Sequence, residues 1–288
     1  MNDKFSLSHK SEEPENGVLY VVGTPIGNLG DISFRALNIF KNVSLIACED
    51  TRQTRKIMTK FQFRNNLTSF NKYNSNKKIP QIISDLNLGK SIAVVSDAGM
   101  PSICDPGEDL IKEARSNGIN VICIPGPCAA IAALVSSGFP SSKFIFEGFL
   151  PKKNSEREKI LLEIGSNEKT TILFESPHRL KNLLIKLKEI CGGEREIIVA
   201  RELTKKYEEN IGNNIEEAIS YFKEREVIGE ITLVIRGVKK EKKNQDYNTE
   251  ELKKDLLELK KAGLNLSAAS KYLAKKNNIK KSIIYDMY

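Results

Sequence analysis

Uninterrupted apolar runs recur along the first 140 residues, and loops rich in glycine and proline follow three of the four. The runs cover residues 18–22, 45–48, 92–95 and 121–124. Strands that are apolar on both sides are typical of parallel sheets that helices cover on both faces. Segments with helical spacing lie between the runs, at residues 33–41, 109–117 and 129–137. The alternation predicts an open α/β sheet, the first domain, over residues 18–140.

The same alternation continues over residues 141–238. Strand-like runs cover residues 144–146, 170–174, 197–200 and 230–235, and helical spacing covers residues 155–164, 178–190 and 215–223. This segment predicts a second α/β domain, with a more mixed sheet than the first.

The two ends of the chain have different patterns. Residues 1–17 are polar and are expected to form a flexible tail, and residues 239–248 are a charged linker. Beyond the linker, residues 249–288 predict a small helical domain of helix-turn-helix type. Its helices are expected at 250–262, at 268–276 with Ser267 as the cap, and from Ser282. A domain of this size is expected to pack on the body or on a partner.

The composition narrows the class of protein. The 288 residues include 45 Lys and Arg against 37 Asp and Glu, and the resulting net charge of +8 favours an anionic partner without requiring one. The five cysteines include no C-x-x-C pair, so mostly buried, reduced thiols are expected. The two histidines, His9 and His178, are too few for a multi-histidine metal site, and no metal is expected. The sequence has neither a run of roughly 20 apolar residues nor a signal segment, so a cytoplasmic location is expected.

Glycine occurs together with proline in the loops at residues 23–28, 96–101 and 125–127. Ligands of open α/β sheets bind beyond the carboxyl ends of the strands, where glycine permits close approach and a helix start offers free N–H groups. One such loop would be an ordinary turn, whereas three predict a shared crevice. The loops lack G-x-x-x-x-G-K-[ST], so they do not form a Walker-type nucleotide site. They also lack G-x-G-x-x-G, the motif of the usual dinucleotide site. Asp97 and Asp105 make the crevice slightly acidic, which favours a zwitterionic or cationic nucleoside over a triphosphate.

Eight motifs together resemble one methyltransferase family. They are VGTPIGNLGDISFRAL (22–37), EDTR (49–52), SDAGMPSICDPG (96–107), IPGPCAAIAALVSSGFP (124–140), FEGFLPKK (146–153), ESPHRL (175–180), ARELTKKYEE (200–209) and GEITLVIRG (229–237). In this order they resemble the bacterial 16S ribosomal RNA (cytidine-2′-O)-methyltransferases of the tetrapyrrole-methylase superfamily. The resemblance implies two α/β domains with S-adenosylmethionine between them and a small C-terminal helical domain. It also implies a cytoplasmic homodimeric enzyme that methylates a cytidine ribose in 16S rRNA of the small ribosomal subunit.

The resemblance also assigns the cofactor-binding positions. These are Thr24, Pro25 and Gly27 in the first loop; Asp97, Gly99, Met100 and Pro101 in the second; Gly126, Pro127, Ala129 and Ala130 in the third; and Ser176, Pro177 and Thr232 in the second domain. Small residues at the start of the third helix would let the ligand lie close to the backbone.

Basic residues within the motifs are the candidates for RNA binding. They are Arg52, Arg55, Lys152, Lys153, Arg157, Arg179 and Arg201, and His178 could stack on a base. An internal salt bridge explains each arginine equally well, most of all Arg201, which Glu202 follows. The lysines of residues 249–288 suit either RNA docking or a solvated surface.

Four carboxylates are candidates for the general base. Glu49, Asp50, Glu175 and Glu202 all follow strand ends, and Glu175 is the preferred catalytic residue. Asp50 could instead hold Arg52. Methyl transfer to a ribose hydroxyl is an in-line displacement, so we expect alignment to supply most of the rate and no single carboxylate to be indispensable.

Three alternatives remain open from the sequence. The first is methylation, on the same fold, of a tetrapyrrole or of a modified histidine in a translation factor. The second is an RNA-binding protein without enzymatic activity. The third is a dinucleotide oxidoreductase, although the sequence offers no properly placed pyrophosphate loop.

Overall fold

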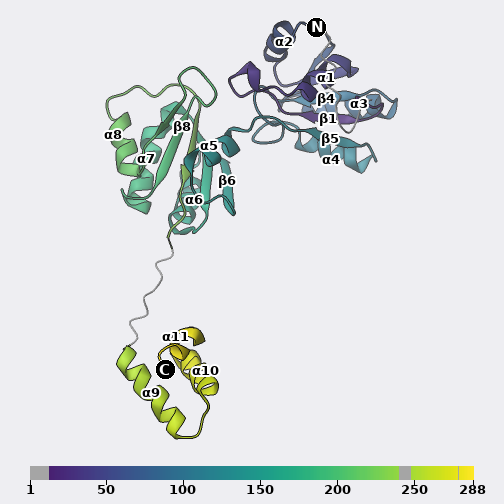
Figure 1. Ribbon diagram of the computed structural model, residues 1–288. Coiled ribbons are helices and arrows are strands. Elements are labelled where there is room, and N and C mark those ends of the chain that lie inside the picture. The colour runs from purple at the N-terminus through teal and green to yellow at the C-terminus, as the bar shows by residue number, and fades with distance from the viewer. Residues whose placement is uncertain (1–12, 240–247, 278) are drawn as a thin grey trace, which may run out of the picture. The chain divides into compact units, whose positions relative to one another are not determined.

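The computed structural model describes residues 13–239, 248–277 and 279–288, and the chain divides into two compact units (Figure 1). The division falls between Val238 and Lys239. The larger unit contains two sheets, and the smaller unit is helical.

The first sheet is fully parallel, as the apolar runs predict. Its strands are β1 (Leu19–Val22), β2 (Leu45–Cys48), β3 (Leu67–Ser69), β4 (Ile92–Val95) and β5 (Val121–Ile124), in the order β3-β2-β4-β1-β5. One face packs against α1 (Phe34–Asn42) and α2 (Thr51–Lys60), and the other against α3 (Ser75–Asn87) and α4 (Glu108–Ser116). Because both faces are covered, successive residues such as Leu19 and Tyr20 are both fully buried.

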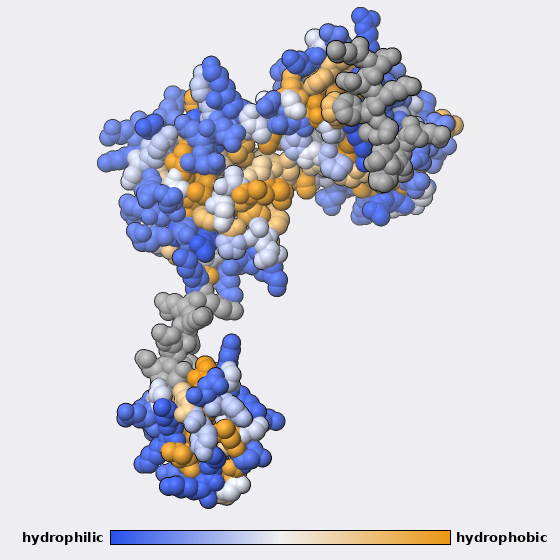
Figure 2. Space-filling view, viewed as in Figure 1, coloured by the Kyte–Doolittle hydropathy of each residue, from blue (hydrophilic) through white to orange (hydrophobic). Residues whose placement is uncertain are grey.

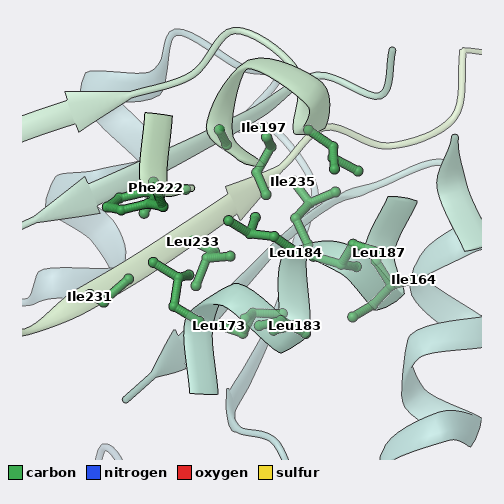
Figure 3. Close-up of a cluster of buried hydrophobic side chains, with 14 of the residues drawn as sticks. Ile164, Leu173, Leu183, Leu184, Leu187, Ile197, Phe222, Ile231, Leu233 and Ile235 are labelled. Atoms are coloured by element: carbon green, nitrogen blue, oxygen red, sulfur yellow. The ribbon is translucent and has the colours of Figure 1, made fainter. Parts of the chain in front are cut away.

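The second sheet is mixed, which confirms the prediction. Its strands are β6 (Phe144–Phe149), β7 (Thr170–Glu175), β8 (Ile197–Arg201), β9 (Glu209–Ile211) and β10 (Ile231–Ile235), in the order β6-β7-β10-β8-β9. β6 and β7 are parallel, and the other neighbours are antiparallel. One face packs against α6 (Asn154–Ser166), α7 (Pro177–Cys191) and α8 (Ile215–Phe222). Figure 3 shows Leu173, Leu233 and Ile235 of this face beside Leu183, Leu184 and Leu187 of α7.

The other face of the second sheet carries α5 (Ala129–Ser137), the helix that follows the last strand of the first sheet. Figure 1 shows α5 beside this sheet, and Ala130, Ala133 and Leu134 pack against Ile172 of β7 and Val234 of β10. The predicted domain boundary at residue 140 therefore differs from the packing, since the chain crosses to the second sheet before α5. The carboxyl end of β5 and the start of α5 thus lie where the two sheets meet.

Several elements carried too weak a signal to be predicted. They are α2, α3, β3, β9 and a short 3₁₀ helix, η1 (Leu29–Asp31). Polar residues dominate α2 and α3, and Pro80 lies inside α3. The expectation that the cysteines are mostly buried was wrong. Only Cys48 of the five free thiols is buried, whereas Cys123 on the edge strand β5 is exposed.

The predicted tail and linker lie largely outside the described residues. Residues 1–12, with His9, and residues 240–247 are among those that the structure does not describe. Residues 13–17 are described, and Glu13 is 7% exposed. Both oxygens of its carboxylate accept hydrogen bonds from Arg35 of α1, at 2.6 and 2.7 Å. This two-point contact fixes the described part of the tail to the larger unit.

The smaller unit consists of α9 (Thr249–Lys261), α10 (Leu266–Lys276) and α11 (Lys281–Tyr285). Leu252, Leu256, Leu273 and Ile284 form its own apolar core. Asn265 caps α10 through a hydrogen bond to the N–H of Ala268, so the predicted cap at Ser267 was wrong by two residues. None of the helices in the described residues is long and apolar enough to cross a membrane.

Candidate functional site

A cavity of about 500 Å³ lies in the larger unit, where loops of the first sheet meet strand ends of the second. Its lining comes from the loop after β4, the start of α5, the ends of β6 and β7, and the segment that enters β10. Of the predicted positions, those that line it are Asp97, Gly99, Met100, Ala129, Glu175, Ser176, Pro177 and Thr232.

The other predicted cofactor positions support this wall or lie beside it. Thr24 is 1% exposed and pairs with Gly99 through two backbone hydrogen bonds of 2.9 and 3.1 Å. Gly126 lies against Gly23, where a Cβ on Gly23 would come within 2.7 Å of the Gly126 Cα. The remaining positions, Pro25, Gly27, Pro101, Pro127 and Ala130, are likewise outside the lining of this cavity. Gly23 and Gly126 therefore allow the first and third loops to lie in contact with one another.

Thirteen further residues line the cavity without having been assigned to the cofactor. They are Ile26, Glu49, Ala98, Ile103, Cys104, Asp105, Cys128, Phe149, Phe174, Leu203, Gly229, Glu230 and Ile231. Most belong to the quoted motifs, so position within a motif was the available signal. Phe149 follows a bulge in β6, where the register with β7 shifts between Phe146 and Gly148 and Gly148 has φ +61°. The ring centroid of Phe149 lies 5.5 Å from that of Phe174. The register of that bulge could not be deduced from composition.

Three carboxylates of the first sheet share the cavity wall, and each has a raised pKa. Burial raises the pKa of Asp105, and repulsion from Asp97 adds to it. Burial, followed by repulsion from Asp105 and Asp97, raises the pKa of Glu49. Burial also raises the pKa of Asp97, although the N–H of Asp50 donates a hydrogen bond of 2.9 Å to its Oδ1. A positively charged ligand would relieve this repulsion.

Glu175 contributes the most deeply buried carboxylate of the cavity. It ends β7, and its side chain is 0% exposed. Its Oε1 accepts a hydrogen bond of 2.8 Å from the N–H of Ser176 and lies 3.3 Å from Nε of Arg179. Its Oε2 has no hydrogen-bond partner among the described residues. A buried carboxylate oxygen without a partner is costly, and a ligand hydroxyl or amine could satisfy it.

Two of the other candidate bases, Asp50 and Glu202, have internal roles, whereas Glu49 lines the cavity. Asp50 caps α2 and accepts hydrogen bonds from the side chain of Arg52, which lower the pKa of Asp50 to about 2. Glu202 accepts hydrogen bonds from Lys205 and from the N–H of Glu230, at 2.7 and 2.9 Å. Neither carboxylate lines the cavity. In the part of the chain that the structure describes, no group of three His, Cys, Asp or Glu residues is arranged to hold a metal ion.

Two of the predicted RNA-binding arginines are held inside the larger unit. Arg201 donates two hydrogen bonds to Glu209, at 2.9 and 3.0 Å, and its side chain is 14% exposed. Its partner is therefore Glu209 and not the expected Glu202. Arg179 donates to the carbonyl of Leu150 at 3.1 Å and pairs with Glu175. Both guanidinium groups have structural roles that account for them.

The remaining candidates for RNA binding face solvent to differing degrees. Arg52, Arg55, Lys152, Lys153 and His178 are exposed, and Arg157 is half-buried. Arg52 is anchored on Asp50, and Lys153 pairs with Glu156 at 2.9 Å. Arg52 and Arg55 belong to α2, whereas Lys152 and Lys153 lie between β6 and α6. Arg157 belongs to α6, and His178 lies in the first turn of α7.

Comparison with known proteins relates the chain to methyltransferases. The model of a family described as tetrapyrrole (corrin/porphyrin) methylases matches residues 18–219. A relative from Synechocystis sp., named ribosomal RNA small subunit methyltransferase I, is 42% identical over 94% of this chain and 97% of its own length. Relatives with the same name from Thermotoga maritima and Bacillus subtilis are 47% and 40% identical, over 77% and 99% of this chain and 99% and 97% of their own.

Solved structures with the same fold have much lower sequence identity. Uroporphyrin-III C-methyltransferase from Thermus thermophilus has a TM-score of 0.56 and 16% identity, over 76% of this chain and 94% of that one. A cobalt precorrin-4 methyltransferase has a TM-score of 0.58 and 12% identity, over 76% and 95%. A structure of the Thermus enzyme complexed with S-adenosyl homocysteine has a TM-score of 0.53 and 13% identity, over 75% and 96%. At these identities the likeness concerns the fold alone.

Proposed function

We propose that this chain, which belongs to the tetrapyrrole (corrin/porphyrin) methylase family, methylates a cytidine ribose of 16S rRNA. The premise is that, within that family, the chain belongs to the ribosomal RNA small subunit methyltransferase I family. The protein is a methyltransferase, and its methyl donor is S-adenosylmethionine. Transfer to the 2′-hydroxyl of the cytidine is the finer part of the proposal. The observation that carries it is the acidic, partly apolar cavity bounded by the family's own loop motifs.

The cavity fits the donor in size and in charge. A volume of about 500 Å³ lies within the roughly 300–1,000 Å³ that small-molecule sites occupy. Phe149, Phe174 and Ile103 offer apolar contact area, and Glu49, Asp97 and Asp105 offer negative charge. When bound, the donor supplies a methyl group attached to a positively charged sulfur. The lining carboxylates therefore stabilise the ligand by charge as well as by hydrogen bonding.

Glu175 is the residue that we propose to act on the acceptor hydroxyl. Its Oε2 is buried, lacks a partner among the described residues, and belongs to a residue that lines the cavity. Arg179 and the N–H of Ser176 hold the other oxygen, which fixes the orientation of the carboxylate. Oε2 can accept a hydrogen bond from the hydroxyl and receive its proton as the new bond forms. Alignment and exclusion of water by the surrounding loops supply the larger part of the rate.

Exposed basic residues and the half-buried Arg157 supply the proposed RNA contacts of the larger unit. Arg52 and Arg55 of α2, together with Lys152, Lys153 and Arg157, remain available to phosphate oxygens. The proposal leaves out Arg179 and Arg201 because their paired side chains are only 27% and 14% exposed, whereas Arg52, although paired with Asp50, is 83% exposed. His178, at the start of α7 and exposed, is placed to stack on a base.

A homodimer in the cytoplasm completes the proposal. Exposed apolar side chains, including Ile131 and Val135 of α5 and Phe144 of β6, support an interface on the larger unit. Figure 2 shows apolar residues gathered on the visible surface of that unit. Light scattering on the purified protein tests the dimer, and a monomer at micromolar concentrations would contradict it.

A direct assay separates the proposed function from its alternatives. The purified protein is incubated with methyl-labelled donor and, in parallel, with assembled small ribosomal subunits, naked 16S rRNA and a tetrapyrrole. We expect label in the ribosomal RNA and none in the tetrapyrrole. Label in the tetrapyrrole alone would favour the first alternative. Binding of RNA without any transfer would favour a protein without enzymatic activity.

A further inference from the structure

A second, smaller cavity lies in the larger unit and shares part of its wall with the first. Its volume is about 340 Å³, and the residues common to both cavities are Ile26, Asp97, Ala98 and Glu230. Its own lining consists of Pro25, Gly27, Leu29, Gln53, Lys56, Ile57 and Lys205. It therefore joins the first glycine-proline loop, one side of α2, and the loop between β8 and β9.

The residues of this second cavity combine apolar, amide and cationic chemistry. Pro25 and Ile57 are buried and give it an apolar wall, whereas Gln53 and Lys56 of α2 are exposed at its rim. The amide of Gln53 can both donate and accept hydrogen bonds. Apolar surface, one amide and ammonium groups are together suited to a nucleotide, which has a flat base, a polar edge and a phosphate.

Lys205 is held in place at the boundary between the two cavities. Its Nζ lies 2.7 Å from Oε1 of Glu202 and 3.0 Å from Oε2 of Glu230, and its side chain is 28% exposed. Although burial acts to lower it, the hydrogen bonds to Glu202 and Glu230 raise the pKa of Lys205. Glu202 and Glu230 thereby fix the position of the ammonium group, and the side chain of Lys205 stays in the lining of the second cavity, where a phosphate of the ligand can approach it.

The loop that carries Lys205 is strained and lies against Gly27. Glu202 and Thr204 have φ values of +53° and +66°, which are uncommon for residues other than glycine. A Cβ on Gly27 would clash with the Lys205 and Thr204 side chains. Backbone strain of this kind often accompanies binding sites, where surrounding contacts maintain it. Gly27 thus permits the approach that places Lys205 in the wall of the second cavity.

We propose that the second cavity receives the target nucleotide of the RNA, with Gln53 at the edge of the base and Lys56 and Lys205 at the adjacent phosphates. This inference rests on the proposed function and names the residues that select the acceptor. A methyl acceptor must lie within about 3–3.5 Å of the donated carbon, so its site has to adjoin the donor site. A cavity of this size accommodates one nucleotide taken out of its stack, and enzymes that act on nucleotides commonly extrude them in this way.

Substitutions on the exposed face of α2 test the proposal without disturbing the fold. We compare Gln53→Ala and Lys56→Ala with Lys60→Ala, an exposed lysine one turn further along α2 that lines neither cavity. We expect the first two variants to lower kcat/KM for small ribosomal subunits by about 10-fold or more, and Lys60→Ala to lower it by less than about twofold. All three are expected to bind S-adenosylhomocysteine as the wild type does.

Two further measurements separate base recognition from phosphate contact. Gln53→Glu removes the amide donor, so the preference for cytidine over uridine at the target position should change by about fivefold or more. Lys205→Met should reduce the salt dependence of RNA binding by about one unit of slope. If the wild type methylates RNA while every variant behaves like Lys60→Ala, the subsite is overturned and the proposed function stands. If the wild type transfers no methyl group to RNA, the proposed function fails and this inference fails with it.

Discussion

Glu175 ends β7 and Arg179 lies in the first turn of α7, and the carboxylate Oε1 of Glu175 is 3.3 Å from the guanidinium Nε of Arg179. The pair places a guanidinium group beside a fully buried carboxylate whose second oxygen lacks a partner among the described residues. A single strand end and the helix that follows it, β7 and α7, thus provide both the carboxylate and the residue that orients it.

Replacing this carboxylate should slow turnover without abolishing it. Glu175→Gln keeps the shape of the side chain and removes the proton acceptor, so we expect kcat to fall by about 10- to 100-fold, at the lower end for a catalytic base. Binding of S-adenosylhomocysteine should remain, as calorimetry would measure. The exposed Glu163 of α6 provides the control, since Glu163→Gln should leave kcat unchanged.

Either extreme would contradict part of this account. An unchanged kcat would show that Glu175 has no role in the chemistry. Complete loss of turnover with donor and RNA binding intact would show that alignment does not supply most of the rate.

The close contact between the first and third loops should tolerate no side chain at Gly23. A Cβ there would lie 2.7 Å from the Gly126 Cα and 2.6 Å from the Met100 Sδ, and the Gly126 backbone cannot move aside freely. We expect Gly23→Ala to lower the free energy of unfolding by about 1–3 kcal/mol and to weaken donor binding. Gly30→Ala is the matched control, because its nearest neighbour is the Asn28 side chain at 3.1 Å. Equal stability of the two variants in denaturant titrations would contradict the packing argument.

Asp105 should make the protein less stable at neutral pH in the absence of the donor. Burial, and then repulsion from Asp97, raise the pKa of Asp105 above its ordinary 3.8, although Ser96 and Lys72 oppose the shift. A carboxyl whose pKa is higher in the folded state stabilises the fold at pH values below its unfolded pKa. That contribution is lost as the pH rises through the raised, folded pKa. Asp105→Asn should therefore raise Tm at neutral pH and leave it nearly unchanged near pH ~3.5.

The same substitution should weaken binding of a cationic donor. Asp105→Asn removes negative charge from the cavity wall, so affinity for S-adenosylmethionine should fall by more than affinity for S-adenosylhomocysteine, whose sulfur carries no charge. Calorimetry with both ligands measures the difference. Equal losses for the two ligands would show that the carboxylate acts through hydrogen bonding alone.

The sequence predicted the strands and the crevice loops more reliably than the residues that face the ligand. Apolar runs such as residues 92–95 needed no tertiary information, because burial on both faces leaves no polar position. In contrast, α2 presents mostly polar side chains, and only Thr54, Ile57 and Met58 are buried. Whether Arg201 binds RNA or Glu209 depends on the pairing of β8 with β9, a contact that no local pattern encodes.

The smaller unit should contribute to RNA affinity through its lysines. Lys253, Lys254, Lys271 and Lys275 are exposed on α9 and α10. Ending the chain after Lys243 removes them together, and we expect weaker binding to small ribosomal subunits with a smaller salt slope. Unchanged affinity and slope would assign these lysines to a solvated surface. Donor binding to the larger unit provides the control, because its cavity has no lining residue beyond Thr232.

Mass spectrometry of 16S rRNA from cells with and without this protein tests the central claim most directly. The account predicts one ribose methyl group on one cytidine, present with the wild-type protein, absent without it and reduced with Glu175→Gln. An identical set of methylated nucleotides in both strains, or a mark on a base instead of a ribose, would contradict it.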